Sequence, residues 1–464
     1  MLIEGYHPAV EDAEIYLPGI EKILHPQLFP INSEFFEAHA HSTLFPHLIA
    51  ASVRMSHLRV ETAVFVWQIV SIFLLLLACW QLSARCFNYP RCRWAGVALV
   101  AVLLTLPIAG TALYIVDQYL NPRNLSAFAA IFAIVEALDR KYVQAGLFLV
   151  FAGAIHPLMS VFAFSFCILL VALRERTPMF WLLAIAPFGI SLARPPGPYH
   201  QVALAHSYFY ITRWHWYEWL GVIGPVLILV WFARLALQRK WPNVVLLCRT
   251  LVVYELIYLA AALVISVPAR FEALARLQPM RSLYLVYLMM IVIAGGVLVE
   301  AVLKNHVWRW LVLFVPLSAG MFTGQRMLFP ADAHLEWPWA SHKNQWVQAF
   351  EWIRDNTPQA SIFALDPEYM DIPGEDEQGF RAIAQRSSLA DAVKDSGAVS
   401  MFPLMADEWW RQVQAQSNWS TFQLQDFRRL QAQYGVNWVV VQPPPVAGLD
   451  CPYQNPAVKV CRLN

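Results

Sequence analysis

Long apolar stretches recur through the middle of the chain and constrain its fold more than any other feature. An α-helix needs about 20 apolar residues to cross the hydrocarbon core of a membrane. Ten stretches can be distinguished, at residues 62–84, 94–116, 125–139, 142–155, 158–173, 178–194, 218–237, 248–268, 282–303 and 307–323. The pattern predicts a polytopic α-helical membrane protein with about ten transmembrane helices.

The composition agrees with a chain embedded in a lipid bilayer. Hydrophobic residues make up 58% of its 464 residues and charged residues only 14%, against about 25% charged residues in soluble proteins. A purely soluble enzyme and a disordered protein are thereby excluded. The 33 Lys and Arg against 32 Asp and Glu leave no surplus to neutralise nucleic-acid phosphates, so we expect no nucleic-acid partner.

Lysine and arginine are distributed unevenly between alternate breaks in the apolar pattern. One set of breaks holds thirteen of them: Arg85, Arg91, Arg93, Arg140, Lys141, Arg174, Arg176, Arg234, Arg239, Lys240, Arg249, Lys304 and Arg309. The other set holds six: Arg123, Arg194, Arg213, Arg270, Arg276 and Arg281. Basic residues are retained on the cytoplasmic side, so residues 1–61 and 324–464 are expected outside the cytoplasm.

The exported N-terminal segment begins with a cluster of acids. Residues 7–24 have apolar side chains at near-helical spacing, and Glu11, Asp12 and Glu14 lie at their start. Acids in the first turn are favoured by the helix dipole and by capping. The pattern leaves open whether they only initiate a helix or also face a cleft at the membrane surface.

Two further features of this segment bear on its role. Residues 33–60 have helical character and carry His39, His41, His47 and His57. These histidines could be metal ligands, but His39 and His41 lie two apart and so face different sides of a helix, which favours interfacial histidines. The first five residues lack the charged and apolar regions of a signal peptide. An acidic tail could cross unaided, but we expect an additional apolar helix of about 20 residues to be encoded upstream.

Two of the short breaks carry candidate binding residues. Fourteen residues from 142 to 155 reach only about 21 Å as a helix, so His156 is expected at a recessed turn lining an outward-facing cavity, or as a simple helix cap. Arg123, Arg276 and Arg281 are expected at the outer membrane face. They suit a lipid phosphate, which a guanidinium holds bidentately, or are ordinary interfacial residues beside an aromatic belt.

Residues 340–464 are less apolar and long enough for one soluble domain. Helices are predicted at 346–358, 404–415 and 420–434, and strands at 361–366, 436–442 and 457–463, which together indicate a small α/β layer. Cys451 and Cys461 lie ten residues apart in this exported region, where a disulfide could persist; two unpaired thiols in a strand are the alternative.

The layout resembles the GT-C superfamily of integral membrane glycosyltransferases, which use polyprenyl-phosphate-linked sugars. The segments GYHPAVEDAEIYLPGIEKIL, IHPL, NPRN, LQPMR and FEWIRDNTPQASIFALDP resemble a family of bacterial multi-pass membrane proteins with the same presumed fold. The resemblance implies a location in the bacterial cytoplasmic (inner) membrane with the C-terminal domain in the periplasm.

The resemblance also implies roles for particular residues. GT-C enzymes place an essential acid in the first external loop, often near a divalent metal, and Asp12 fits that position best, with Glu11 and Glu14 as neighbours. Arg123, Arg276 or Arg281 would then hold the departing phosphate, and the recessed turn at His156 would border a groove for the isoprenoid tail. We expect a sugar transferase.

Two other classes of protein remain open from the sequence. The chain could be a non-catalytic membrane scaffold that binds a partner through its exported domain. A transporter is the third alternative, although the apolar stretches show no repeated halves or broken helices in matching positions.

Overall fold

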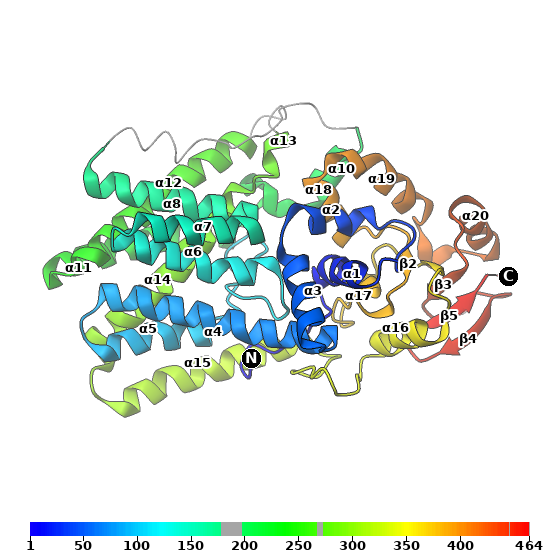
Figure 1. The fold of residues 1–464 in the computed structure, drawn as a ribbon, viewed down its shortest axis with the longest axis horizontal. Helices are drawn as coiled ribbons and strands as arrows, with labels where there is room; N and C mark the ends of the chain where they lie inside the picture. Colours follow the sequence, from blue (N-terminus) through cyan, green and yellow to red (C-terminus); the bar gives the residue numbers. More distant parts are fainter. Residues whose placement is uncertain (178–196, 267–271, 445, 464) are drawn as a thin grey trace.

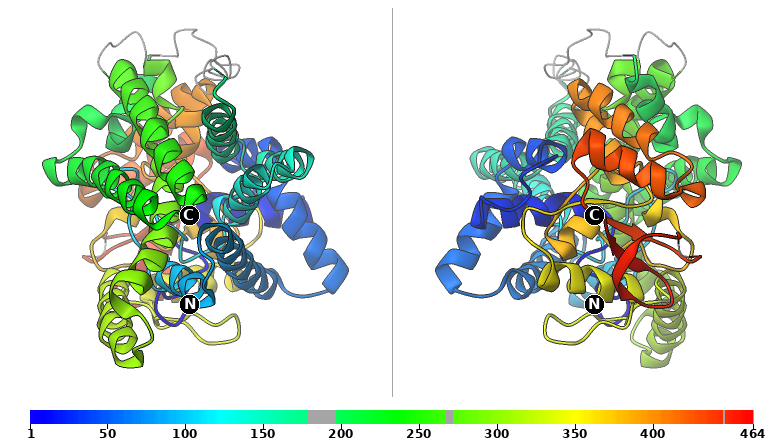
Figure 2. Two further views of the ribbon diagram at one scale, coloured as in Figure 1. Left: turned by 90° about the vertical axis from the view of Figure 1, so that its left-hand side faces the viewer. Right: turned by 90° about the vertical axis from the view of Figure 1, so that its right-hand side faces the viewer.

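The computed structural model describes residues 1–177, 197–266, 272–444 and 446–463. A bundle of long helices forms one end of the elongated molecule and a small sheet forms the other (Figure 1). The first three helices lie between them. The two views along the long axis show the bundle from one end and the sheet from the other (Figure 2).

Within the described residues, six helical segments are long and apolar enough to cross a membrane. They are α4 (Val60–Cys86), α8 (Pro157–Glu175), α11 (Trp216–Arg239), α12 (Pro242–Ser266), the continuous segment Pro279–Leu303, and α15 (Val307–Leu328). The segment Pro279–Leu303 consists of the 3₁₀ turn η4 (Pro279–Ser282), α14 (Leu283–Leu298) and the π-helical η5 (Val299–Leu303). The described residues thus form a mostly helical protein with six candidate membrane-spanning helices, which is compatible with the predicted polytopic helical fold.

Ten transmembrane helices are not found among the described residues. The helices α5 (Pro90–Val102), α6 (Pro122–Leu138) and α7 (Tyr142–Ile155) have 13, 17 and 14 residues, shorter than the usual crossing of about 20 residues. The predicted stretch 178–194 lies outside the described residues.

The prediction of one helix over 94–116 is wrong beyond Val102. Residues 103–121 form an irregular segment that returns toward α6, with a bridge between Pro107 and Tyr114. Proline has no N–H to continue a helix. At Gly110 a Cβ atom would lie 2.6 Å from the ring of Trp214, so this close approach requires a glycine.

The segments between helices that are rich in Lys and Arg contact one another at one end of the bundle. These contacts join Arg85 to Asp139 at 2.9 Å, Arg140 to Glu175 at 3.4 Å, and Arg91 to Asn305. The helices α4, α6 and α8 each begin at the opposite end, next to the N-terminal segment. The alternation of basic residues in the sequence thus corresponds to the two ends of the folded bundle.

The N-terminal segment forms three short helices, α1 (Ala13–Leu24), α2 (Glu34–Ser42) and α3 (Phe45–Ser56). Both α2 and α3 pack on α1, and α1 also contacts helices of the C-terminal domain. Ile20, Phe45 and Ile49 are buried and join the core of the bundle, whereas Phe29 and Phe36 form a small core of their own.

The C-terminal domain is the predicted α/β layer. Its helices are α16 (Gln345–Asn356), α17 (Phe380–Ala384), α18 (Lys394–Met401), α19 (Ala406–Ala415) and α20 (Leu424–Tyr434). Its strands are β1 (Ile362–Ala364), β2 (Ser387–Ser388), β3 (Trp438–Val441), β4 (Asp450–Gln454) and β5 (Lys459–Arg462). The sheet order is β2-β1-β3-β5-β4, in which β1 pairs in parallel with β2 and β3, and β5 is antiparallel to β3 and β4.

The edge strands β2 and β4 were not predicted from the sequence, because neither has the apolar pattern of a buried strand. The two residues of β2 carry no apolar pattern, and β4 alternates half-buried and exposed residues, as a strand with one open face does. Cys451 on β4 and Cys461 on β5 form a disulfide. It joins the edge strand to the buried strand beside it.

Four short elements connect the bundle to this domain. They are the helix α10 (Tyr199–Ala205), the 3₁₀ turns η1 (Ser207–Phe209) and η2 (Ile211–Arg213), and the helix α13 (Glu272–Ala275). Tyr199 and Val202 are fully buried in a cluster that also contains Val399 and Trp409. Buried residues of α10 and of the C-terminal domain therefore share one hydrophobic cluster.

Candidate functional site

Two cavities meet at the start of α1, between the bundle and the C-terminal domain. Their volumes are about 270 Å³ and about 310 Å³. The first, the polar cavity, is rich in charged side chains, and the second, the inner cavity, includes the turn before α8. Both cavities are lined by Asp12, Arg123, Tyr208, Arg281 and Gly397.

Asp12 is the N-cap residue of α1, yet its carboxylate makes no hydrogen bond to the helix backbone. The preceding residue, Glu11, has a left-handed backbone with φ of +57°, a conformation that non-glycine residues rarely adopt. Its N–H donates to the carbonyl of Glu377 at 3.1 Å. The C-terminal domain thus fixes the turn, and Asp12 points into the cavities instead of capping its own helix.

Two cations lie close to the Asp12 carboxylate. Arg123 approaches Oδ2 at 3.6 Å and the Lys394 ammonium approaches Oδ1 at 3.9 Å. Burial alone would raise the pKa of Asp12, but the charges of Lys394 and Arg123, with a smaller contribution from Arg281, outweigh burial and lower the pKa below its ordinary value of 3.8. Asp12 is therefore ionised at neutral pH.

The local sequence explains where Arg123 lies. Asn121 caps α6 by accepting a hydrogen bond from the N–H of Asn124 at 3.1 Å, and Pro122 occupies the first helical position. Asp117 receives both the Asn121 amide at 2.6 Å and the Arg123 guanidinium at 2.9 Å. The NPRN segment is thus a helix start that holds Arg123, 7% exposed, against Asp117 and Asp12.

Arg281 differs from the other two cations of the site. Among the described residues no carboxylate lies within 4.0 Å of its guanidinium, and its buried Nε–H has no hydrogen-bond acceptor. The guanidinium lies over the ring of Tyr208, 5.3 Å from the centroid. A buried donor without a partner is costly, and a guanidinium is suited to phosphate or carboxylate oxygens.

His156 occupies the turn between α7 and α8 and lines the inner cavity. Its Nδ1 also accepts a weak hydrogen bond, 3.4 Å long, from the N–H of Met159. Both interpretations from the sequence therefore describe it, as a cap and as a lining residue. Pro157, Leu158 and Phe402 give the inner cavity an apolar wall.

Glu14 and Arg276, two of the expected site residues, line neither cavity. The Glu14 carboxylate turns away from Asp12 and accepts hydrogen bonds from the N–H groups of Arg381 and Ala382, both at 3.0 Å. It caps α17 of the C-terminal domain and pairs with the Arg381 side chain at 3.2 Å. Glu14 therefore lines neither of the two cavities and does not cap its own helix, so neither of the two interpretations from the sequence describes it.

Lys394 is the main residue that the sequence did not indicate. It begins α18, contacts Glu11, and approaches Glu377 at 3.8 Å in addition to Asp12. These carboxylates raise the pKa of Lys394 against the opposing effect of burial. A single lysine more than 300 residues downstream of its partners has no local pattern that marks it.

A divalent metal at Asp12, which the resemblance implies, does not fit this arrangement. Lys394 and Arg123 are held beside the Asp12 carboxylate, and the neighbouring carboxylates are already matched, Glu11 with Lys394 and Asp117 with Arg123. A cation there would face fixed positive charges at close range.

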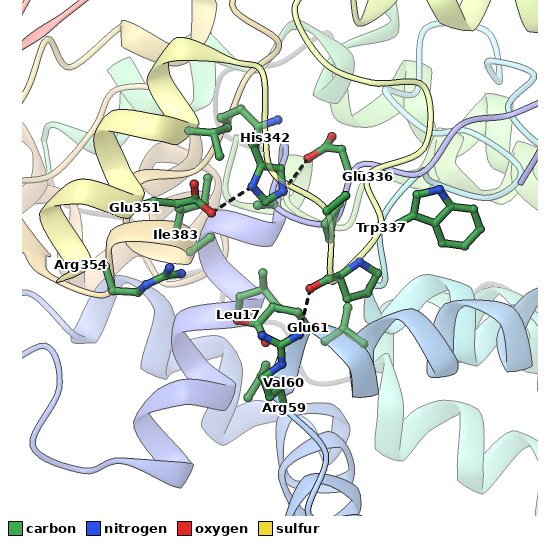
Figure 3. Close-up of a pocket in the computed structure, with 18 of the residues that line it drawn as sticks. Leu17, Arg59, Val60, Glu61, Glu336, Trp337, His342, Glu351, Arg354 and Ile383 are labelled. Atoms are coloured by element: carbon green, nitrogen blue, oxygen red, sulfur yellow. Dashed lines mark hydrogen bonds and ion pairs between the residues drawn. The ribbon is translucent and has the colours of Figure 1, made fainter. Parts of the chain in front are cut away.

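A third cavity, about 370 Å³ and larger than the polar cavity and the inner cavity, lies apart from Asp12 where α1, the start of α4 and the segment after α15 meet (Figure 3). His342 lies inside it, with Nδ1 3.0 Å from Glu351 and Nε2 3.8 Å from Glu336. Trp337 and Trp339 stack on each other at its rim, with centroids 5.4 Å apart. None of the residues expected from the sequence to act on substrate lines this cavity.

A comparison of the chain with protein-family models and with curated proteins finds no match to either. The assignment of a function therefore depends on the geometry of the site.

Proposed function

We propose that the chain is a membrane glycosyltransferase of the GT-C type. It transfers a sugar from a polyprenyl-phosphate donor to an acceptor at the outer face of the cytoplasmic membrane. The observation that carries the proposal is the guanidinium of Arg281, which pairs with no carboxylate of the described residues and lines both cavities together with the ionised Asp12. An anion receptor beside a proton acceptor is what this reaction requires.

In this proposal Arg281 binds the lipid phosphate and Asp12 accepts a hydrogen bond from the acceptor hydroxyl. The bond between the sugar's anomeric carbon and the phosphate oxygen breaks, and polyprenyl phosphate leaves with the electron pair. As the acceptor oxygen bonds to the same carbon, its proton passes to Asp12. Arg123, already paired with Asp117, positions Asp12 and adds positive charge near the phosphate.

The two cavities suit two different substrates. The inner cavity reaches the turn at His156 and has an apolar wall, so it is assigned to the lipid phosphate and the first part of its tail. The polar cavity contains Glu11, Asp117 and Lys394, and hydroxyl groups bind readily to such charged groups, so it is assigned to the acceptor. Asp12 and Arg281 lie at the boundary between them.

Binding of labelled polyprenyl phosphate to the purified chain in nanodiscs tests the phosphate role. Arg281→Gln is expected to weaken binding by about ten- to hundredfold, the loss expected for charge-assisted hydrogen bonds. Arg276→Gln is the matched control, because Arg276 belongs to the same connecting segment and lines neither cavity. Equal binding by Arg281→Gln and wild type would contradict the proposal.

The alternative function, a non-catalytic scaffold, makes a different prediction in the same system. A scaffold could retain the lipid in the inner cavity, but it would release no polyprenyl phosphate from any lipid-linked sugar supplied. Lipid binding that depends on Arg281, without turnover over a panel of donors and acceptors, would favour the scaffold.

A further inference from the structure

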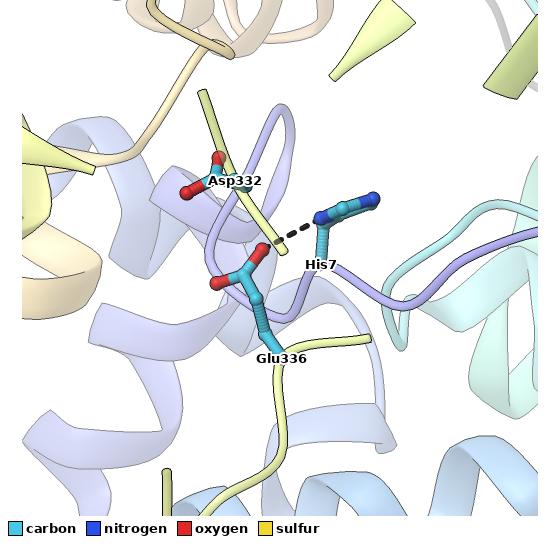
Figure 4. Close-up of side chains that lie close together, drawn as sticks. All are labelled: His7, Asp332 and Glu336. Carbon is cyan, nitrogen blue, oxygen red and sulfur yellow. Dashed lines mark hydrogen bonds and ion pairs between the residues drawn. The ribbon is translucent and has the colours of Figure 1, made fainter. Parts of the chain in front are cut away.

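A histidine near the N-terminus lies beside two carboxylates of the segment that follows α15. His7, Asp332 and Glu336 are 0%, 3% and 5% exposed. Each offers one ligand atom, and these atoms lie within 4.8 Å of one another. His7 Nδ1 and Glu336 Oε1 are 2.6 Å apart, and Asp332 faces the same space from the other side (Figure 4).

The orientation of the histidine ring is fixed from two sides. The ring stacks on Phe329 with centroids 4.1 Å apart, and Nδ1 is turned toward Glu336. On its far side Gly5, with φ of +82°, passes so close that a Cβ atom would lie 3.0 Å from Nε2. The chain therefore presents Nδ1 to the two carboxylates in a preorganised position.

Two buried oxygen atoms beside the cluster have no hydrogen-bond partner. Gln378 is 3% exposed and donates its amide nitrogen to Asp332 Oδ2 at 2.7 Å, which leaves its Oε1 next to the same carboxylate without a donor. Asp376 is 5% exposed and accepts the N–H of Asp332 at 2.7 Å through Oδ2, while its Oδ1 has no partner. A cation bound beside them would satisfy both acceptors.

The protein itself supplies too little positive charge here. No lysine or arginine in the described part of the chain approaches Asp332, Glu336 or Asp376 within 4.0 Å. Arg326 lies nearby but donates to the backbone carbonyls of Phe329 and Asp332. His342 approaches Glu336 at 3.8 Å but also pairs with Glu351 at 3.0 Å, so within the described residues these buried carboxylates are compensated only in part, which is unfavourable.

We propose that His7, Asp332 and Glu336 bind one divalent transition-metal cation, with the free oxygens of Gln378 and Asp376 available to complete its coordination. An imidazole nitrogen combined with carboxylate oxygens suits Zn²⁺, and Mn²⁺ to a smaller extent, whereas Mg²⁺ and Ca²⁺ prefer oxygen ligands alone. The site is independent of the sugar-transfer proposal.

The cation joins the N-terminal segment to the start of the C-terminal domain. Tyr6 already pairs with this segment through two backbone hydrogen bonds of 3.0 Å, to the carbonyl of His334 and from the N–H of Glu336. The N–H of His7 donates to the carbonyl of Gln118, next to the Asp117 that holds Arg123. Metal binding at His7 would therefore stabilise the irregular segment that leads into Asp12.

Titration of the EDTA-treated, detergent-solubilised full chain with ZnCl₂, MnCl₂ and MgCl₂ tests the site by calorimetry and thermal unfolding. One Zn²⁺ per chain and a raised unfolding temperature are expected, with at least about tenfold weaker binding of Mg²⁺. His7→Gln and Asp332→Asn should each weaken Zn²⁺ binding at least about tenfold. His334→Gln and the exposed Asp355→Asn are the matched controls and should bind as wild type does.

X-ray absorption of the Zn²⁺-loaded chain gives a second measurement that does not depend on the folding of a variant. The expected first shell contains one imidazole nitrogen and oxygen ligands, without sulfur. A sulfur-containing shell, no Zn²⁺ binding by the wild type, or equal binding by folded His7→Gln and Asp332→Asn would each overturn the proposal.

Discussion

Oδ2 of Asp12 lies 3.6 Å from a guanidinium nitrogen of Arg123, and Arg123 is held in place by Asp117 at 2.9 Å. This pair connects the first helix of the chain to the beginning of α6. The carboxylate is positioned by a charge that another residue fixes, so it stays ionised and oriented without capping α1. Such preorganisation is what a proton acceptor in a cavity requires.

The pH dependence of sugar transfer should reflect the lowered pKa of Asp12. Because the ionised carboxylate is the active form, its contribution is complete above the ordinary pKa of 3.8 and is lost only as pH falls through the lower pKa of the folded state. Rates measured from about pH 5 to 8 should show no acid limb caused by Asp12. An acid limb near pH 6 that disappears in Asp12→Asn would contradict this.

Lys394→Met should raise the pKa of Asp12 and so move the acid limb of sugar transfer to higher pH. The ammonium lies 3.9 Å from Asp12 and also contacts Glu11, so its loss removes the largest charge effect that lowers the pKa of Asp12. We expect the acid limb of Asp12, followed at pH values extended below its ordinary pKa of 3.8, to move to higher pH than in the wild type, and lipid binding to change little. Lys343→Met is the control, because Lys343 is exposed in the segment before α16.

Arg381→Met should destabilise the C-terminal domain strongly. Arg381 is 2% exposed and neutralises Glu14 at 3.2 Å, Asp391 at 3.3 Å and Asp395. Removing the cation leaves buried carboxylates without compensation, which costs about 3–5 kcal/mol of unfolding free energy. Chemical denaturation measures it. Arg411→Met, at a pair where the arginine is 68% exposed, should change stability by less than about 1 kcal/mol.

The proposed orientation in the membrane can be tested by thiol labelling of intact cells. The five unpaired cysteines are buried, which gives a low background. Ser417→Cys, exposed after α19, should react with an impermeant maleimide from outside. Asn88→Cys, exposed between α4 and α5 at the basic end of the bundle, should react only after the membrane is opened. The reverse pattern would place Asp12 in the cytoplasm and exclude the proposed reaction.

The regular parts of the fold were predictable because their signals are local. Apolar length marked the long helices, and alternating helix and strand patterns marked α16, α19, α20, β1, β3 and β5. The irregular segment 103–121 was not predictable, because its apolar residues look like a helix and its path depends on the close approach of Gly110 to Trp214. Composition could not distinguish apolar residues in a packed loop from those in a membrane helix.

Part of the candidate site was also predictable. Asp12, Arg123, His156 and Arg281 carry charged or titratable groups next to helix starts, and the fold brings all four to the inner cavity. Charge pattern alone could not separate Glu14 from Asp12, since a shift of two residues directs Glu14 into the C-terminal domain. Contacts such as those of Lys394, or of His7 with Glu336, join segments hundreds of residues apart and have no local signal.

The most direct test of the account is the release of polyprenyl phosphate from polyprenyl-phosphate-linked sugars by the wild-type chain and by Asp12→Asn, with acceptor present. Asparagine has nearly the same shape but cannot accept the hydroxyl proton, so we expect the rate to fall by at least about a hundredfold. Lipid binding and the unfolding temperature should remain near wild type. Wild-type turnover by a folded Asp12→Asn chain would contradict the assignment of Asp12 as the proton acceptor.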